Sequence, residues 1–196
     1  MARLNARSRK KFRVCNNRLL FDVLPEVKMP SAKEIQELLK LKPLPVEGGY
    51  FAETYRSKFA LSQRSLPPGY SAKHALSTAI YYMLTPDTFS AMHRLKGDEV
   101  YHFYLGDPAE MLILKPDGTG ETLLMGQDIV SGMRLQHVVR GGVWQGSRLA
   151  PGGQFALLGT TMVPGFDPAD FELGPRKELS SQYPAYTRLI AVLTRG

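Results

Sequence analysis

The chain has 196 residues, of which 43% are hydrophobic and 10% aromatic, so it is long enough to bury the core of one globular domain. No apolar run reaches the ~18 residues that a membrane-spanning helix requires, so we expect a soluble protein with no membrane partner. Cys15 is the only cysteine, which excludes an internal disulfide and favours a cytoplasmic setting.

The net charge of +7 comes from the N-terminus. Seven of the 25 Lys and Arg residues fall in the first twenty positions, which contain no Asp or Glu, and the remaining 18 basic residues match the 18 acidic ones. A nucleic-acid-binding domain would carry its basic residues on a folded face, so a nucleic-acid partner is disfavoured. We divide the chain into a basic N-terminal extension (1–28) and one domain (29–196). Targeting, nucleic-acid contact and no specific role all stay open for the extension.

The domain is predicted to begin with a short helix. Ser31 and Glu34 form a capping box, and Ile35, Leu38 and Leu39 fall on one face behind it. Strands separated by turn signals are then expected at 50–56, 77–84, 99–105, 109–114, 121–125, 136–139 and 154–162. A second helical stripe follows Pro184 and consists of Tyr186, Leu189, Ile190 and Leu193.

Residues 90–106 contain the strongest candidate site. His93, Glu99 and His102 lie on or between two strand-like runs that end at Gly106. An imidazole and a carboxylate six residues apart can converge across a short polar loop, either to bind a metal or to transfer a proton. The alternative for each residue is a hydrogen-bonded position at the rim of a sheet.

Side-chain alternation limits which of these residues can act together. With a period of two, Glu99, Tyr101 and Phe103 share one face of a strand, and His102 and Tyr104 share the other. A single cluster of His93, Glu99 and His102 therefore does not follow from the sequence, and His102 is expected to be structural unless a bulge reverses the parity.

The segment around His93 resembles the first cupin motif, which has two histidines, a glutamate and a glycine. His93, Glu99 and Gly106 occupy the first histidine, the glutamate and the glycine positions. Leu95 stands where the second histidine would be.

Residues 140–145 resemble the second cupin motif. Gly142 is retained, whereas Arg140 replaces a proline and Gln145 replaces the third histidine. These departures are similar to one branch of the superfamily, the DUF985 or cupin-5 family of uncharacterised RmlC-like cupins. Further segments that resemble this family are 45–50, 53–57, 77–82, 93–107, 163–166 and 170–173.

The resemblance implies an all-β, single-domain cupin jelly-roll barrel with short N- and C-terminal helices. It also implies that His93, Glu99 and Gln145 face the barrel interior together, with His93 and Glu99 as the catalytic candidates. A mouth rich in aromatic and polar side chains would suit a small ring-shaped or apolar molecule. The ligand-binding candidates are Tyr50, Glu53, Tyr55, Tyr101, Phe103, Gln136, Trp144, Gln145 and Glu172.

Two classes of function are open, and the sequence does not decide whether the protein is an enzyme. The first is a module that binds a small organic ligand in the barrel without chemistry. The second, by resemblance to the metal-independent sugar-nucleotide epimerases, is a sugar or carbonyl epimerase or isomerase in which His93 and Glu99 transfer protons. A metal-dependent oxygenase is less favoured, because Leu95 cannot coordinate and Gln145 offers only a neutral amide oxygen.

No cofactor is expected, although a weak or adventitious divalent metal at His93 and Glu99 stays open. His74 and His137 have no His or Cys at metal-ligand spacing and are expected to be ordinary core or surface residues. We expect a homodimer in addition to a small-molecule ligand, because open β sandwiches leave edge strands that must be paired or covered.

Overall fold

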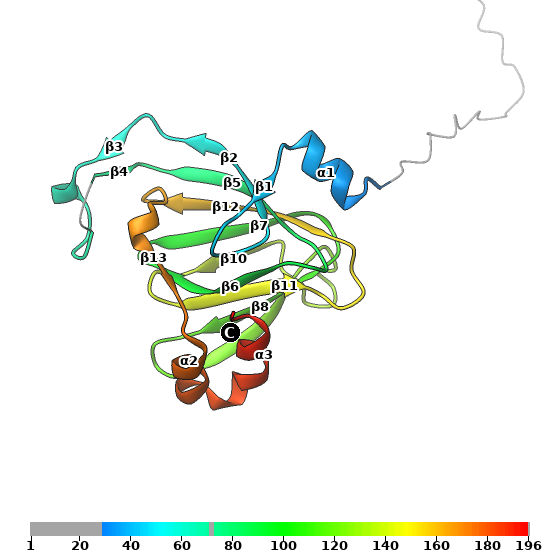
Figure 1. Ribbon diagram of the computed structural model, residues 1–196. Coiled ribbons are helices and arrows are strands. Elements are labelled where there is room, and N and C mark those ends of the chain that lie inside the picture. Colours follow the sequence, from blue (N-terminus) through cyan, green and yellow to red (C-terminus); the bar gives the residue numbers. More distant parts are fainter. Residues whose placement is uncertain (1–28, 71–72, 196) are drawn as a thin grey trace, which may run out of the picture.

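Two antiparallel sheets packed face to face form the body of the protein (Figure 1), and the computed structural model describes residues 29–70 and 73–195. The six-stranded sheet has the spatial order β1 (Lys42–Pro43), β2 (Tyr50–Arg56), β5 (Thr78–Leu84), β12 (Ala156–Val163), β7 (Asp98–Gly106) and β10 (Gln136–Val139). The five-stranded sheet has the order β13 (Phe171–Leu173), β6 (Phe89–Leu95), β11 (Trp144–Leu149), β8 (Ala109–Leu114) and β9 (Gly120–Met125). Strands β3 (Ala60–Leu61) and β4 (His74–Ala75) pair separately.

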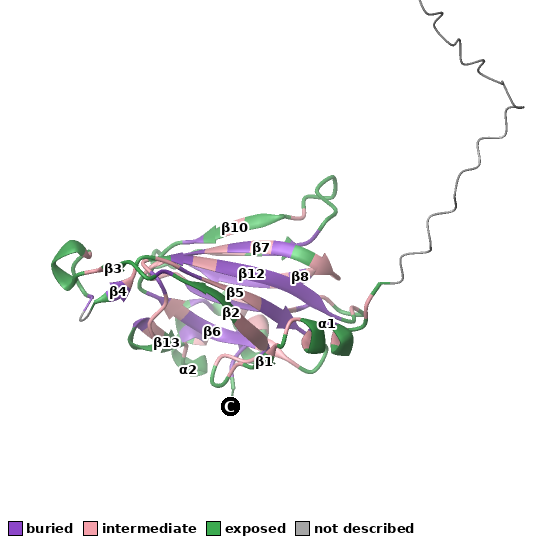
Figure 2. Cartoon of the chain, turned by 90° about the horizontal axis from the view of Figure 1, so that it is seen from above, coloured by how far each residue is buried: buried purple, intermediate pink, exposed green. Residues whose placement is uncertain are grey.

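The core lies between the sheets because each strand alternates apolar and other side chains with a period of two. In β5, Ile80, Tyr82 and Leu84 face inward, and they meet Met111 and Ile113 of β8 from the opposite sheet. Figure 2 shows the mostly buried β12 inside the six-stranded sheet, between β5 and β7, and the exposed β10 at its edge. The architecture is a jelly roll, which confirms the all-β prediction.

Helices pack on the outer faces of both sheets, and on the six-stranded sheet they cover only a part. Helix α1 (Ala32–Leu38) packs through Ile35 against Met83 on the six-stranded sheet. The five-stranded sheet is covered by α2 (Arg176–Gln182) and α3 (Thr187–Val192), as Figure 1 shows. The short 3-10 turns are η1 (Gln63–Ser65), η2 (Pro168–Asp170) and η3 (Pro184–Tyr186).

The capping box predicted at Ser31 is confirmed, since its hydroxyl accepts from the Glu34 amide and the Glu34 side chain accepts from the Ser31 amide. Placing Leu38 on the packed face was wrong. Leu38 is exposed, because the helix is only seven residues long and its contact with the sheet is made by Ile35 and, one turn later, Leu39. The predicted stripe after Pro184 is confirmed at Ile190, which is fully buried on α3.

Gly106 ends β7 as expected from its position. Its φ is +97°, and a Cβ built there would lie 2.3 Å from the Phe155 carbonyl oxygen. Only glycine fits such a turn without displacing the backbone. The chain can therefore leave β7 directly into β8, which keeps both strands close to the site described next.

The strands carrying His93 and Gln145 were the hardest to place from the sequence. β11 was not among the predicted strands, because its inward positions Gln145 and Ser147 are polar and Gly146 separates them, so no apolar alternation marks it. The predicted extension 1–28 lies outside the described residues. Within those residues, no helix is both long and apolar enough to cross a membrane.

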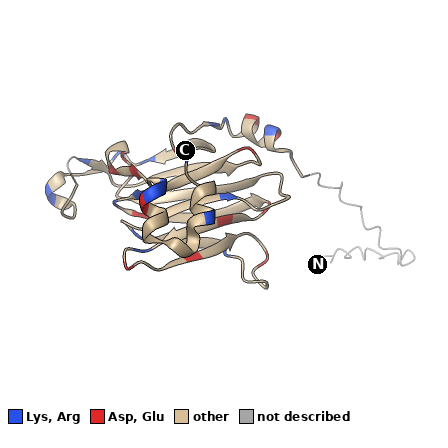
Figure 3. Cartoon of the chain, turned by 60° about the horizontal axis from the view of Figure 1, so that its bottom comes forward, with Lys and Arg blue, Asp and Glu red and all other residues tan. Residues whose placement is uncertain are grey.

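Charged residues of both signs are scattered over the described body rather than separated by sign (Figure 3). Many of them form ion pairs on the surface, such as Arg94 with Glu172 and Arg148 with Glu110.

Candidate functional site

Three strands from the two sheets bring His93, Glu99 and Gln145 together. Gln145 on β11 lies directly opposite His93 on the neighbouring β6, and its amide Nε2 donates to Glu99 Oε2 on β7 of the other sheet at 2.7 Å. The exposed fractions of the three residues are 1%, 7% and 1% for His93, Glu99 and Gln145. The Gln145–Glu99 hydrogen bond thus crosses the space between the sheets.

The parity of β7 explains why Glu99 points inward and His102 does not. Tyr101 and Phe103 are in the interior core with the same parity as Glu99. His102 and Tyr104 stack on each other on the opposite face, with ring centroids 6.3 Å apart. His102 is therefore not part of the His93–Glu99 site, as the alternation predicted.

One nitrogen of His93 is already committed. Its Nδ1 lies 2.8 Å from the Ala91 carbonyl oxygen, and its ring stacks on Phe171 at 5.0 Å. A carbonyl oxygen can only accept, so Nδ1 carries the hydrogen of this bond. The ring is held on both its edge and its face, which fixes its orientation.

Gln145 is only half satisfied. Its Nε2 donates to Glu99, but its Oε1 is buried without a hydrogen-bond partner in the described structure. An unsatisfied buried polar atom costs about 1–3 kcal/mol, so such an atom calls for an explanation. A bound molecule that donates a hydrogen bond would supply one.

Glu47 is a member of the site that the sequence analysis missed. Ser90 donates to Glu47 Oε1 at 2.7 Å, and the Ala91 amide donates to the Glu47 carbonyl oxygen at 2.9 Å. The residue as a whole keeps intermediate exposure, but the bond from the buried Ser90 draws its carboxyl group into the interior, where it lines the same cavity as Glu99. The only available signal was its place in the segment 45–50, which carried the family resemblance without any assigned role.

Burial raises the pKa of the Glu47 carboxyl above its ordinary value. A positive charge on His93 would oppose this rise in pKa, the negative charge of Glu99 adds to it, and the hydrogen bond from Ser90 opposes it. Burial also raises the pKa of Tyr82 and Tyr101 well above the usual range, and both therefore stay protonated. The Tyr101 hydroxyl hydrogen-bonds to Glu99, which gives that carboxylate a second donor besides Gln145.

The loop that presents Glu47 is held by its glycines. Gly48 has φ +105°, and a Cβ there would lie 2.3 Å from the Phe89 carbonyl oxygen. The Tyr82 hydroxyl donates to the Gly48 carbonyl oxygen at 3.1 Å. Any other residue at Gly48 would displace the loop, so the Gly-Gly pair is needed to place Glu47 over the end of the barrel.

Glu47 and Glu99 line an interior cavity of about 90 Å³. The wall is otherwise mainly apolar. Glu53 is a third carboxylate in it, and no Lys or Arg is among the lining residues. Glu53 is about two-fifths exposed and pairs with Arg56 at 2.7 Å, so its charge is compensated. The lining residues are Leu44, Glu47, Phe51, Glu53, Thr78, Ile80, Leu95, Glu99, Thr160, Met162 and Phe166.

The other ligand-binding candidates divide by the face of the strand that carries them. Tyr101 and Phe103 lie in the interior core, and Glu53 lines the cavity. The cavity wall does not include the remaining five candidates, which are Tyr50, Tyr55, Gln136, Trp144 and Glu172.

Trp144 differs most from expectation. It sits one residue before Gln145, so it points to the outer face, where it packs with Leu179 and Ile190 under the C-terminal helices. Arg94 lies over its ring at 4.4 Å. We expected Trp144 at the barrel mouth, and this was wrong, because the alternation along β11 places its side chain on the outer face of the sheet.

Parity also accounts for the other outward residues. Tyr50 packs on the outer cluster with α1, and Tyr55 is 54% exposed beyond a bulge in β2. Gln136 is exposed on β10 beside His102, with 3.3 Å between Gln136 Nε2 and His102 Nδ1. Glu172 is paired with Arg94 on the outside. None of these four contributes to the cavity wall.

The donor set does not fit the metal that the cupin motifs imply. Leu95 and Gln145 replace two histidine ligands, and the Gln145 amide turns its N–H toward Glu99. Across residues 29–70 and 73–195, no three His, Cys, Asp or Glu side chains are grouped so as to hold a metal ion. The expectation of no cofactor remains a prediction.

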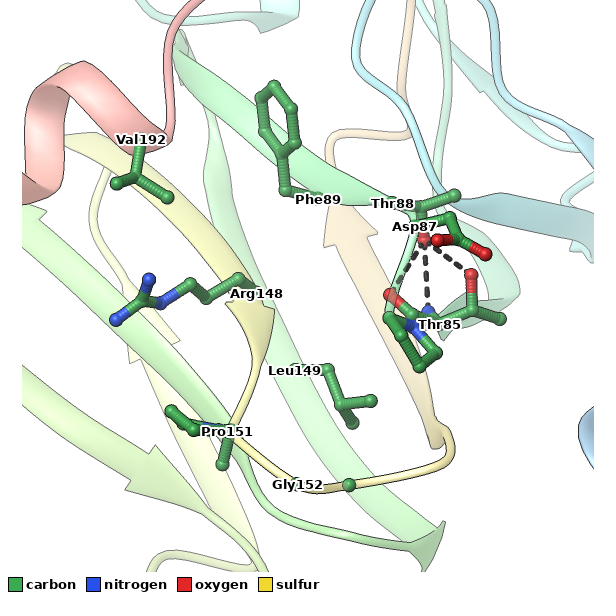
Figure 4. A pocket seen from close by; sticks show the side chains of 12 residues that line it. Thr85, Asp87, Thr88, Phe89, Arg148, Leu149, Pro151, Gly152 and Val192 are labelled. Carbon is green, nitrogen blue, oxygen red and sulfur yellow. Dashed lines mark hydrogen bonds between the residues drawn. The ribbon is translucent and has the colours of Figure 1, made fainter.

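Larger hollows lie on the outer surface. One of about 370 Å³ lies between the turn that begins at Thr85 and residues 148–153 (Figure 4). Two of its polar groups are already used, because Thr88 Oγ1 accepts from the Thr85 amide at 2.9 Å and Arg148 pairs with Glu110 at 2.7 Å. The interior cavity lies between the sheets and is lined by Glu99, one of the two motif residues proposed for catalysis, so it is the stronger candidate site.

Comparisons with known proteins agree with this architecture. An uncharacterized protein of Saccharomyces cerevisiae is 33% identical over 129 residues, which are 62% of this chain and 64% of that protein. A solved structure from Shewanella oneidensis is 31% identical with a TM-score of 0.74, and covers 85% of this chain and 99% of its own. A hypothetical protein from Leishmania major is 28% identical with a TM-score of 0.75 over 85% of this chain and 100% of its own.

The match to a family extends over most of the domain. It runs from residue 33 to residue 174 and therefore includes the Glu47 loop, both His93 and Glu99, and the strand of Gln145. This chain belongs to the cupin-5 family of the cupin superfamily, DUF985.

Proposed function

We propose that this protein binds a small organic molecule in the interior cavity, with Glu47 and Glu99 as its main polar contacts. The observation that carries the proposal is the cavity between the sheets, which both carboxylates line and whose wall is otherwise mainly apolar. A few polar groups on an apolar wall are typical of sites that bind small molecules.

Cavity size limits the ligand. The volume is about 90 Å³, and a water molecule occupies ~30 Å³ in the liquid, so the enclosed part of a ligand has the size of roughly three waters. A nucleotide-linked sugar is far larger and could place only a fragment inside. The size therefore favours a molecule of a few heavy atoms.

The test is a fragment screen by ligand-observed NMR, followed by Glu99→Gln. This change removes the charge of a carboxylate that lines the cavity and should weaken binding of a polar cavity ligand at least tenfold. Glu172→Gln is the matched control, because Glu172 is exposed, pairs with Arg94 and does not line the cavity. Fragments that bind wild type and Glu99→Gln equally would contradict the proposal.

A second candidate is proton-transfer catalysis without a metal, as in an isomerase. It is favoured by the two carboxylates of the cavity, since burial favours a protonated Glu47 while Glu99 accepts two hydrogen bonds. Paired carboxyl groups in unlike environments can act as acid and base. The test is exchange of a substrate C–H with solvent deuterium, which His93→Asn, Glu99→Gln and Glu47→Gln should each reduce by about 10²-fold or more.

Homodimerisation remains a proposal of its own. The outer face of the six-stranded sheet exposes Tyr55, Tyr104 and Val138, and β10 pairs on one side only. A second copy would cover this apolar face and protect the edge. Light scattering should give a dimer mass for the full chain, and also after removal of residues 1–28. Tyr104→Lys should shift the measured mass to that of a monomer.

The cytoplasmic setting is likewise proposed on the single cysteine alone.

A further inference from the structure

The wall of the interior cavity consists mostly of paired strands. Residues of β2, β5, β6, β7 and β12 line it, and the hydrogen bonds of the two sheets hold these strands in place. Among the lining residues that the structure describes, only Leu44, Glu47 and Phe166 come from segments outside the strands. Such segments open at a lower free energy than paired strands, so the way into the cavity is expected at one of them.

The Glu47 loop is held from the interior of the protein. The buried Ser90 donates to the Glu47 carboxylate at 2.7 Å, and the Ala91 amide donates to the Glu47 carbonyl oxygen at 2.9 Å. The buried Tyr82 hydroxyl donates to the Gly48 carbonyl oxygen at 3.1 Å. Moving this loop would leave several buried polar groups without partners, which is costly.

The second segment is the strap, residues 164–167, which joins β12 to η2. Phe166 lies in it, lines the cavity and is only partly buried. Its amide donates to Thr78 Oγ1 at 2.9 Å, and the Gly165 amide donates to the Ala75 carbonyl oxygen at 2.9 Å. The Phe166 carbonyl oxygen accepts from Nη1 of the exposed Arg56 at 3.3 Å. The strap is therefore attached in part from the surface.

Arg56 connects the strap to the cavity wall. Its Nε and Nη2 donate to the Glu53 carboxylate at 3.1 and 2.7 Å, and Glu53 lines the cavity from β2. The strap leads through η2 to β13, which is at the edge of the five-stranded sheet, whereas β2 belongs to the six-stranded sheet. Arg56 therefore bridges segments of both sheets on the side of the cavity that Phe166 covers.

We propose that ligands enter the cavity at Phe166 and that the Arg56 bridge holds this entrance closed. Because Phe166 and Arg56 both reach the surface, water can replace the hydrogen bonds that break when the strap moves outward, so opening costs less here than at the Glu47 loop. This inference concerns access to the cavity and so rests on the proposed ligand binding. Access itself can be measured without any ligand.

Entry can be measured as the rate at which methyl methanethiosulfonate modifies a cysteine in the cavity wall. Thr160→Cys supplies this cysteine, since Thr160 is buried and lines the cavity from β12, and Cys15→Ala removes the only native one. The thiolate attacks the reagent's sulfenyl sulfur, a disulfide to CH3S forms and methanesulfinate leaves. Mass spectrometry of the full chain follows the added CH3S group.

Two variants open the entrance in different ways. Arg56→Met keeps a long side chain without its hydrogen bonds, and Phe166→Ala removes the covering ring, so each should speed the modification of Thr160→Cys about tenfold. Arg94→Met is the matched control, because Arg94 makes a similar bidentate pair with the exposed Glu172 outside the cavity. An unchanged rate in Arg56→Met would overturn the proposal.

A second cysteine position distinguishes local opening from unfolding. Ala109 is fully buried in the core on β8 and does not line the cavity. Modification of Ala109→Cys should not respond to Arg56→Met. Equal acceleration at both positions would assign the effect to loss of stability and overturn the entrance.

Hydrogen exchange in the wild-type protein needs no variant. The amides of Gly165 and Phe166 should exchange about tenfold faster than the Ala91 amide, which is bonded to the Glu47 loop. An Ala91 amide that exchanges as fast as these two would show that the Glu47 loop opens instead, against the proposal.

A fragment that binds the cavity connects the entrance to function. Arg56→Met should raise its association and dissociation rates by a similar factor, about tenfold, and leave its dissociation constant nearly unchanged. Unchanged rates would overturn the entrance while ligand binding stands. If cysteine modification responds as expected but no fragment binds, the entrance stands and the proposed ligand binding fails.

Discussion

Two buried clusters in this protein each combine a histidine with a carboxylate, and they differ in how their charge is compensated. At one end of the sheets, His74 Nε2 lies 2.6 Å from Asp170 Oδ2, and Lys96 Nζ lies 3.0 Å from Oδ1 of the same carboxylate. Tyr70 meets His74 edge-on at 5.0 Å. This cluster provides its own cation, Lys96, and joins β4, the turn after β6 and η2.

The cluster between the sheets has no such cation. Glu47 and Glu99 approach His93 without a Lys or Arg partner in the described chain, and Gln145 keeps an unpaired oxygen. Each cluster buries a histidine and a carboxylate, so burial alone does not mark a binding site. The proposed site differs from the His74 cluster in that its carboxylates Glu47 and Glu99 have no Lys or Arg partner in the described chain.

The largest effect is expected from breaking the compensated cluster. Asp170→Ala would leave the buried His74 and the exposed Lys96 without their shared carboxylate, and leaving a buried polar group unsatisfied costs about 1–3 kcal/mol, or more if the group is charged. Urea denaturation should show this loss of unfolding free energy, and ligand binding should persist under conditions where the variant is folded. A loss below about 1 kcal/mol would mean that the cluster contributes little to stability.

A smaller effect of opposite sign is expected in the uncompensated cluster. Because burial raises the pKa of Glu47 in the folded protein, its contribution to stability is present at low pH and is lost as pH rises through that raised value. Glu47→Gln should therefore be more stable than wild type at pH 8, by about 1–3 kcal/mol, and not at pH 4. Parallel pH–stability curves for the two proteins would contradict the burial of this carboxyl group.

The smallest effect is expected where an ion pair is exposed. Arg94 and Glu172 are about two-fifths and one-half exposed and lie on the outer face of the five-stranded sheet. Glu172→Gln should change the unfolding free energy by less than about 1 kcal/mol, because solvent screens such pairs. Thermal denaturation at low and high salt checks this, and a larger loss would show that the Arg94 contact with Trp144 depends on Glu172.

The sequence predicted much of the scaffold because local rules govern it. Alternation in β7 separated Glu99 from His102, and the capping box placed the start of α1. The family motifs pointed to His93, Glu99 and Gln145 as a group, and the three are adjacent in the structure. Their role in binding or catalysis remains a prediction.

What the sequence missed depends on contacts between distant segments. β11 has polar inward residues and so lacked an apolar pattern, and Trp144 was assigned to the wrong face in consequence. Glu47 was passed over because nothing near it in the chain reveals Ser90, which is 43 residues away and donates to its carboxylate.

By itself, then, the sequence determined the face of β7 that carries Glu99, the turn at Gly106 and the succession of a strand with His93 and a strand with Glu99, since each depends on residues within a few positions of one another. Only the tertiary structure decided that two carboxylates share one cavity without a cation. The charge environment of a buried group is set by whichever segments the fold packs against it, and here these are a loop before β2 and strands from both sheets.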